Sequence, residues 1–216
     1  MFNITKFNEI KELLNKTTKN CEIIAISKNH PVESVEEAIR GGVRIFGENR
    51  VMEAKTKFSN LKINHPEIEL HLTGPLQSNK VKLASSLFDV FHTLDREKIA
   101  KEFFKYTEVI RNKKFFIQVN TGEEKTKSGV YSKYLTEFLK FCRYDMSLNI
   151  IGLMCIPPIN ESAKIHFKRL KDLTLKNNLK QISIGMSSDY LEAVPFDPSY
   201  IRLGTILFGK RNWKKN

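Results

Sequence analysis

Short β-branched or aromatic runs alternate along this chain with longer amphipathic segments. The short runs have the length and composition of buried strands, and they occupy residues 22–27, 43–47, 68–74, 89–95, 113–120, 149–157, 181–187 and 200–209. The longer segments repeat apolar residues at helical spacing, over residues 7–19, 32–42, 51–58, 78–87, 96–110, 132–142, 162–176 and, more weakly, 188–194. The pattern therefore predicts eight strands that alternate with helices, after one extra N-terminal helix.

Strands joined by helix-length crossovers pair in parallel, and eight of them can close into a (β/α)8 TIM barrel without exposed edges. A doubly wound open sheet is the competing architecture. The count of eight, the even spacing and the lack of a GxGxxG motif in the first crossover favour the barrel. We expect residues 1–216 to form a single α/β domain of this kind.

Composition excludes several classes of protein. With 41% hydrophobic and 28% charged residues the chain is globular. No apolar run approaches the roughly 18 residues of a membrane span, and the first residues lack a signal-peptide core, so we expect a cytoplasmic protein without membrane contact. The three cysteines and five histidines show no metal-ligand spacing, which argues against a metal site.

The net charge of +12 raises nucleic acid as a partner. However, 27 lysines against 9 arginines are spread over every predicted helix together with Glu and Asp. This distribution favours a solvated basic surface over a specific nucleic-acid site. The charge would still assist capture of a phosphorylated ligand.

Lys28 follows the first predicted strand and precedes His30 and Pro31, so a barrel places it at the mouth. Partial desolvation and a neighbouring cation favour its neutral amine, which can form a Schiff base with an aldehyde such as pyridoxal phosphate. Taken alone, a lysine at a strand end also suits a surface charge.

The last two strand ends offer an anion cradle. Gly185 and Gly204 allow close backbone approach, and Ser187 and Thr205 add hydroxyl and amide donors. Barrel phosphate sites are often built from the loops after strands seven and eight. Two structural readings remain open: Gly204 relieves crowding inside the barrel, and Ser187 caps the following helix.

Eight motifs in order resemble the YggS/PROSC family of pyridoxal phosphate homeostasis proteins. They span residues 24–209 and read AISKNHP, FGENRVMEA, HLTGPLQSNK, HTLD, KSG, GLMCIPP, SIGMSSD and RLGTILFG. The resemblance implies a barrel similar to the N-terminal domain of alanine racemases, with pyridoxal 5'-phosphate as cofactor. One departure is AVPFDPSYI after Glu192, where we expect the seventh helix to be short and to end before Pro195.

Matching the motifs implies a role for each site residue. Lys28 would be the Schiff-base lysine and Ser187 a phosphate ligand. Gly204 and Thr205 would approach the phosphate, and Arg202 would face the pyridine nitrogen. A permanent cation at that nitrogen disfavours ring protonation and weakens the electron sink.

Four other motif residues have an alternative role or a candidate role. Asn49 is expected to line the pocket, with helix capping as its alternative. His71 and Met154 are expected either to pack against the pyridine ring of the cofactor or to occupy ordinary core positions. Lys80, in the GPLQSNK segment, is a candidate second amine.

We therefore expect a non-catalytic carrier that buffers pyridoxal phosphate or delivers it to apoenzymes that depend on it, as a monomer or weak dimer. The alternative is a pyridoxal phosphate-dependent racemase or lyase. Racemisation needs two opposed acid or base groups, and the sequence offers one obvious member, Lys28.

Overall fold

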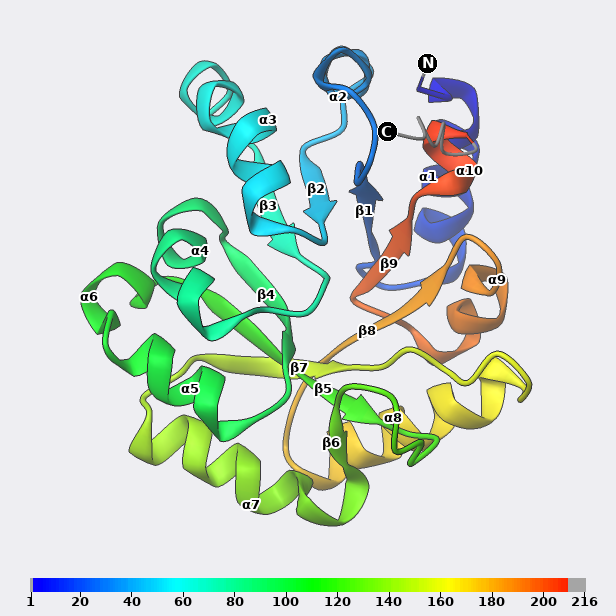
Figure 1. Cartoon of the computed structure of the whole chain (residues 1–216). Coiled ribbons are helices and arrows are strands. Elements are labelled where there is room, and N and C mark those ends of the chain that lie inside the picture. The colour runs from blue at the N-terminus through cyan, green and yellow to red at the C-terminus, as the bar shows by residue number, and fades with distance from the viewer. Residues whose placement is uncertain (1, 210–216) are drawn as a thin grey trace.

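Eight parallel strands close into a barrel, which confirms the predicted architecture (Figure 1). The computed structural model describes residues 2–209. Each strand pairs with the next around the ring, and the last pairs back with the first. The ring consists of β1 (Glu22–Ile26), β2 (Ile45–Glu48), β3 (Glu69–Leu72), β4 (Val90–Leu94), β5 (Lys114–Asn120), β7 (Ile150–Met154), β8 (Gln181–Met186) and β9 (Tyr200–Leu203).

Helices surround this ring (Figure 1). They are α1 (Ile4–Thr17), α2 (Val32–Arg40), α3 (Val51–Asn64), α4 (Val81–Leu87), α5 (Glu97–Phe104), α6 (Thr107–Ile110), α7 (Leu135–Lys140), α8 (Ala163–Lys176), α9 (Tyr190–Ala193) and α10 (Thr205–Phe208). Short helical turns lie at Ser78–Lys80, Ser132–Tyr134, Phe141–Asp145 and Val194–Phe196. As expected, the α-helix after β8 ends before Pro195. Within residues 2–209 no helix has the length and apolar character needed to cross a membrane.

Three elements differ from the sequence prediction. The strand expected over 200–209 ends at Leu203, because Gly204 leaves the extended conformation at φ −113° and ψ −83° and Thr205–Phe208 form α10 instead. The helix expected over 96–110 is split into α5 and α6, because Tyr106 leaves the helical conformation at φ −125° and ψ 34°. A two-residue strand, β6 (Val130–Tyr131), pairs with the carboxyl end of β5 outside the ring. Two residues are too short to show any periodicity, so this strand has no sequence signal.

The core has two layers because successive side chains of a strand point to opposite faces. Outward-facing residues such as Phe46 and Leu70 are fully buried between the strands and the helices. A smaller cluster fills the barrel interior and consists of Ile24, Ile26, Val90, Phe116, Met154 and Tyr200. The interior also holds buried polar side chains, of which His71, His92, Ser183 and Arg202 become important below.

Helix α1 covers the outside of the barrel beside α10 (Figure 1). Its apolar stripe buries Phe7, Ile10 and Leu14. The side chain of Asn3 accepts the Lys6 N–H at 2.9 Å and so caps the helix start. This is the extra N-terminal helix that the amphipathic pattern predicts.

Candidate functional site

A cavity of about 490 Å³ opens at the carboxyl ends of the strands, and we call it the mouth cavity. All six residues proposed from the sequence line it, although they come from both ends of the chain. Its lining consists of Ile26, Lys28, Asn49, Thr73, Ile156, Met186, Ser187, Ser188, Arg202, Gly204 and Thr205. The barrel closure, which pairs β1 with β9, explains why Lys28 and Arg202 share one cavity.

The turn that carries Lys28 is fixed from behind by α3. Asn29 adopts the left-handed conformation at φ 60°, which asparagine tolerates, and its N–H donates to Glu53 Oε1 at 2.5 Å. The Lys57 ammonium donates to the carbonyl oxygens of Ser27, at 2.7 Å, and His30, at 3.3 Å. These bonds bracket Lys28, so its half-buried side chain starts from a defined backbone position.

Lys57 is itself held by a buried carboxylate. Its Nζ lies 2.5 Å from Glu48 Oε1 and 2.8 Å from Glu53 Oε1, and the Ser27 hydroxyl donates to Glu48 Oε1 at 2.7 Å. Burial raises the pKa of Glu48, and the charge of Lys57 acts in the opposite direction. The second oxygen of Glu48 has no hydrogen-bond partner among the described residues. The turn therefore depends on an ion pair taken out of water.

Ser187 lies against the backbone after β9. Its Oγ accepts the N–H groups of Gly204, at 3.2 Å, and Ile206, at 3.4 Å. The capping alternative for Ser187 is wrong, because the residue before α9 is Asp189. These two bonds fix the Ser187 hydroxyl at the wall of the mouth cavity, where its own hydrogen can be donated to a ligand.

Gly204 leaves open space beside those amides. A Cβ built on Gly204 would meet nothing closer than Ile26, at 3.5 Å, which is ordinary contact. Crowding inside the barrel therefore does not require this glycine. Gly185 differs, because its φ of 85° and a contact of 2.9 Å between an added Cβ and Ala193 make it a requirement of the backbone.

Arg202 is buried at the base of the mouth cavity. Its guanidinium donates to Ser183 Oγ at 2.8 Å and to the Cys155 carbonyl at 2.9 Å. Burial lowers the pKa of Arg202. No carboxylate forms an ion pair with it among the described residues. A buried cation with neutral contacts leaves its charge directed at the cavity.

Asn49 lines the cavity and accepts the Thr73 hydroxyl at 3.0 Å. Helix α3 begins after Arg50, so the capping alternative for Asn49 is wrong. An added Cβ on Gly74 would collide with the Asn49 backbone, so that glycine allows the GPLQSNK segment to pack against Asn49. Lys80, His71 and Met154 do not line the cavity, and the last two are core residues.

The sequence analysis missed five lining residues: Ile26, Thr73, Ile156, Met186 and Ser188. Thr73 carries the clearest signal, since it is a polar residue directly after β3. Ser188 follows the predicted phosphate serine. Ile156 and Met186 are apolar residues at strand ends, a pattern that ordinary core packing also produces.

The charges of the mouth cavity select an anionic ligand. Its described lining contains two cations, Lys28 and Arg202, and no carboxylate, tyrosine, histidine or cysteine. The described residues hold no group of three or more His, Cys, Asp or Glu side chains placed to bind a metal ion. A small anion that also offers an electrophile for an amine matches this lining.

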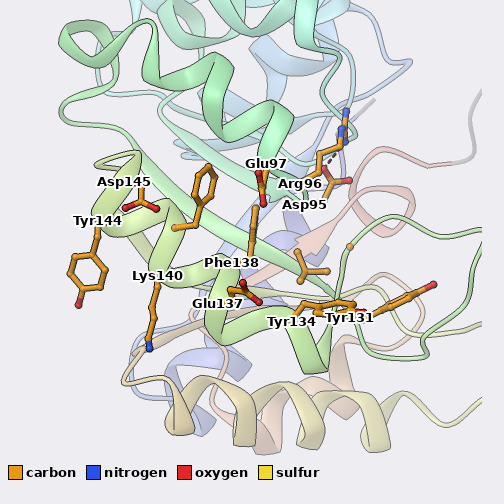
Figure 2. Close-up of a pocket in the computed structure, with 13 residues that line it drawn as sticks. Asp95, Arg96, Glu97, Tyr131, Tyr134, Glu137, Phe138, Lys140, Tyr144 and Asp145 are labelled. Atoms are coloured by element: carbon orange, nitrogen blue, oxygen red, sulfur yellow. Dashed lines mark hydrogen bonds and ion pairs between the residues drawn. The ribbon is translucent and has the colours of Figure 1, made fainter.

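A second cavity of about 670 Å³ lies between α5 and α7 and has the opposite character (Figure 2). Figure 2 shows carboxylates around it, including Asp95, Glu97, Glu137 and Asp145, among aromatic rings. Only two lining residues are cationic. None of the residues proposed from the sequence lines this cavity, and its acidic wall does not suit a phosphorylated ligand.

Comparisons with known proteins agree with this geometry. Residues 6–212 match the family model described as alanine racemase, N-terminal domain. The pyridoxal phosphate homeostasis protein of Vibrio cholerae is 36% identical over 93% of this chain and 90% of its own. PipY of Synechococcus elongatus, solved with pyridoxal phosphate (PLP) bound, is 31% identical, has a TM-score of 0.84, and matches 95% of this chain and 99% of its own.

Alanine racemase from Corynebacterium glutamicum shares the fold alone. It is 14% identical with a TM-score of 0.69, and the match covers 95% of this chain but 60% of the racemase. Both the family model and the relatives cover well over two thirds of the present chain. The chain therefore belongs to the pyridoxal phosphate homeostasis protein family, on a barrel of the alanine racemase N-terminal type.

Proposed function

We propose that this protein binds pyridoxal 5'-phosphate in the mouth cavity and limits or delivers it as a non-catalytic carrier. The observation that carries the proposal is the convergence of Lys28, Ser187, Arg202, Gly204 and Thr205 on one cavity with two cations and no carboxylate in its described lining. Pyridoxal phosphate supplies a reactive aldehyde and a phosphate dianion. Family membership and the bound ligand of PipY support the same cofactor.

Each side chain has a separate task in this proposal. The neutral Lys28 amine adds to the aldehyde carbon and one water leaves, which gives a Schiff base that hydrolysis or a second amine reverses. Ser187 donates its hydroxyl hydrogen to the phosphate, because its Oγ already accepts the Gly204 and Ile206 N–H groups at 3.2 and 3.4 Å. Gly204 and Thr205 approach the phosphate beside it. Arg202 donates toward the pyridine nitrogen and disfavours its protonation.

The same lining argues against the racemase alternative. Racemisation requires a second acid or base on the opposite face of the ring from the lysine. Apart from Lys28, the titratable side chain in the described lining is Arg202, whose guanidinium stays protonated. The arrangement thus holds an aldehyde reversibly without a partner for proton exchange.

Borohydride reduction of the purified protein tests the site. We expect visible absorbance from bound cofactor and, after reduction and digestion, a mass-shifted peptide that contains Lys28. Lys28→Ala should abolish this adduct, and Lys80→Ala is the matched control because Lys80 lies outside the cavity lining. Unchanged labelling in Lys28→Ala would overturn the assignment.

Two further measurements separate a carrier from an enzyme. Incubation with L-alanine and other amino acids should release cofactor without forming a D-amino acid or a cleavage product. Transfer is measured by reactivation of a pyridoxal phosphate-dependent apoenzyme in the presence of the loaded protein. Product formation at a steady rate would support the racemase or lyase alternative instead.

A further inference from the structure

A continuous chain of hydrogen bonds crosses the barrel interior behind Arg202. Arg202 bonds Ser183 Oγ at 2.8 Å, and Ser183 Oγ lies 3.0 Å from His92 Nδ1. His92 Nε2 lies 2.8 Å from His71 Nδ1, and His71 Nε2 lies 2.7 Å from Glu69 Oε1. We call these five side chains the barrel relay. Its four interior members, all except Glu69, are 5% exposed or less.

The donors of the relay all point in one direction. The Glu69 carboxylate, whose pKa is lowered to about 2, only accepts, so His71 carries a hydrogen on Nε2 and donates it to Glu69. Burial lowers the pKa of both His71 and His92, so each ring is neutral and carries one hydrogen. His71 Nδ1 therefore accepts from His92 Nε2, and His92 Nδ1 accepts the hydroxyl hydrogen of Ser183. Ser183 Oγ in turn accepts from the guanidinium of Arg202, which has donors only.

The relay joins two cavities at opposite ends of the barrel. Arg202 lines the mouth cavity. Glu69 begins β3 and lines a cavity of about 420 Å³ beneath α1, where Lys114 pairs with it at 3.2 Å. Glu69 touches none of the residues that line the mouth cavity by any described hydrogen bond or ion pair. A change at Glu69 can therefore reach the mouth cavity through the relay.

We infer that the barrel relay is a positioning device that compensates the buried charge of Arg202 and fixes its orientation toward the bound cofactor. A buried cation needs a partner, and the described structure gives Arg202 no carboxylate in contact. The negative ends of the aligned Ser183, His92 and His71 dipoles point toward Arg202. The chain of hydrogen bonds ends at the negative charge of Glu69. Arg202 is thus stabilised without a carboxylate at the cofactor site.

The rings around the relay hold it in place but do not replace it. Phe116 stacks on His92 with centroids 4.6 Å apart, and Tyr200 meets both imidazoles edge-on. These contacts restrict ring rotation, which preserves the direction of each hydrogen bond. A variant that alters only this packing is therefore the proper control for one that cuts the relay.

The tautomers can be measured directly on protein labelled with ¹⁵N-histidine. We expect side-chain spectra at neutral pH to show both His71 and His92 as neutral rings with hydrogen on Nε2. In Glu69→Gln, whose amide can donate as well as accept, the tautomers are no longer fixed and both rings should become mixtures, whereas Ser183→Ala should leave the hydrogen of His92 on Nε2. A protonated ring, or hydrogen on Nδ1 of either histidine in the wild-type protein, would overturn the relay.

The effect of the relay on cofactor binding is tested with Glu69→Gln, which removes the negative charge at the end of the relay farthest from Arg202. The inference rests on the proposed cofactor site, and we expect Glu69→Gln, Ser183→Ala and His92→Phe each to weaken pyridoxal phosphate retention by about tenfold, the usual effect of losing a hydrogen bond to a charged group. His92→Gln, with both a donor and an acceptor, should recover part of the loss. Phe116→Leu is the packing control and should retain the cofactor.

The outcomes separate the relay from the proposed function. Wild-type affinity in a folded Glu69→Gln variant would overturn the relay even if the tautomers are as expected. A Phe116→Leu loss equal to that of His92→Phe would also overturn it, because packing alone would then explain the effect. A wild-type protein that binds no pyridoxal phosphate would refute the proposed function, and the tautomer measurement would still test the relay.

Discussion

Replacing Lys57 with methionine should strongly destabilise the protein and release the turn that carries Lys28. The side chain is buried, and its ammonium contacts Glu48, Glu53 and the carbonyl oxygens of Ser27 and His30. Methionine fills a similar volume without any donor. Glu48 would then keep the Ser27 hydroxyl as its donor while its negative charge remains buried.

The magnitude follows from the loss of one partner in a buried ion pair. Such a loss costs about 3–5 kcal/mol, because the remaining charge is uncompensated. A domain is stable by about 5–15 kcal/mol, so Lys57→Met removes a large share of the free energy of unfolding. With a urea m-value of about 3 kcal/mol/M, the midpoint of urea unfolding should fall by about 1 M or more.

Three comparisons make the Lys57→Met prediction specific. Lys55→Met changes an exposed lysine of the same helix and should stay within about 0.5 kcal/mol of the wild type. The double variant Glu48→Gln with Lys57→Met should recover much of the loss, since no buried charge remains. Borohydride labelling of Lys28 should fall in Lys57→Met even where the protein is still folded.

The pH dependence of Lys57→Met has a definite sign. Burial raises the pKa of Glu48, and removing Lys57 removes the charge that opposes the rise. The folded variant then binds a proton more tightly than the unfolded chain, so its stability deficit should shrink as the pH falls. A loss of unfolding free energy below about 1 kcal/mol at neutral pH, or a loss that grows as the pH falls, would refute the reasoning.

Three other predictions concern single positions. Gly204→Ala should fold with unchanged stability, because its Cβ meets nothing closer than 3.5 Å, yet it should lose cofactor retention in an equilibrium binding assay. Burial raises the pKa of Cys155 to about 12, so its thiol should resist alkylation at pH 8 until urea unfolds the chain. The His71 hydrogen bond lowers the pKa of Glu69 to about 2. The wild type should therefore have an unfolding free energy about 1.5–3 kcal/mol larger than that of Glu69→Gln. In urea titrations this difference should be present above pH 4.5 and disappear toward pH 2.

The barrel was predictable because its strands differ so clearly from its helices. Runs such as 113–120 are fully apolar in their middle, as strands buried on both faces must be. The site was predictable for a related reason, since parallel strands bring all their carboxyl ends to one face. Lys28 and Ser187 each follow such an end and share the mouth cavity.

The supporting contacts were not predictable in the same way. Lys57 lies on the apolar face of α3. The i,i+4 spacing gives Glu53 as one partner, but Glu48 is a partner only because β2 ends beside that face. The partner of His92 Nδ1 is Ser183, 91 residues away, and no spacing along the chain encodes that contact. A polar residue inside an apolar strand was the one available signal, and it does not name the partner.

Two acidic residues stabilise the mouth cavity without entering it. Glu48 holds Lys57, which fixes the Lys28 turn from behind, and Glu69 ends the relay that supports Arg202 from the far side of the barrel. A carboxylate in direct contact with Lys28 or Arg202 would also stabilise these cations, but it would repel a phosphate. Placing the negative charges one or several hydrogen bonds away keeps the fold stable and the cavity positive. Acidic residues behind a site can therefore stabilise its cations without repelling an anionic ligand.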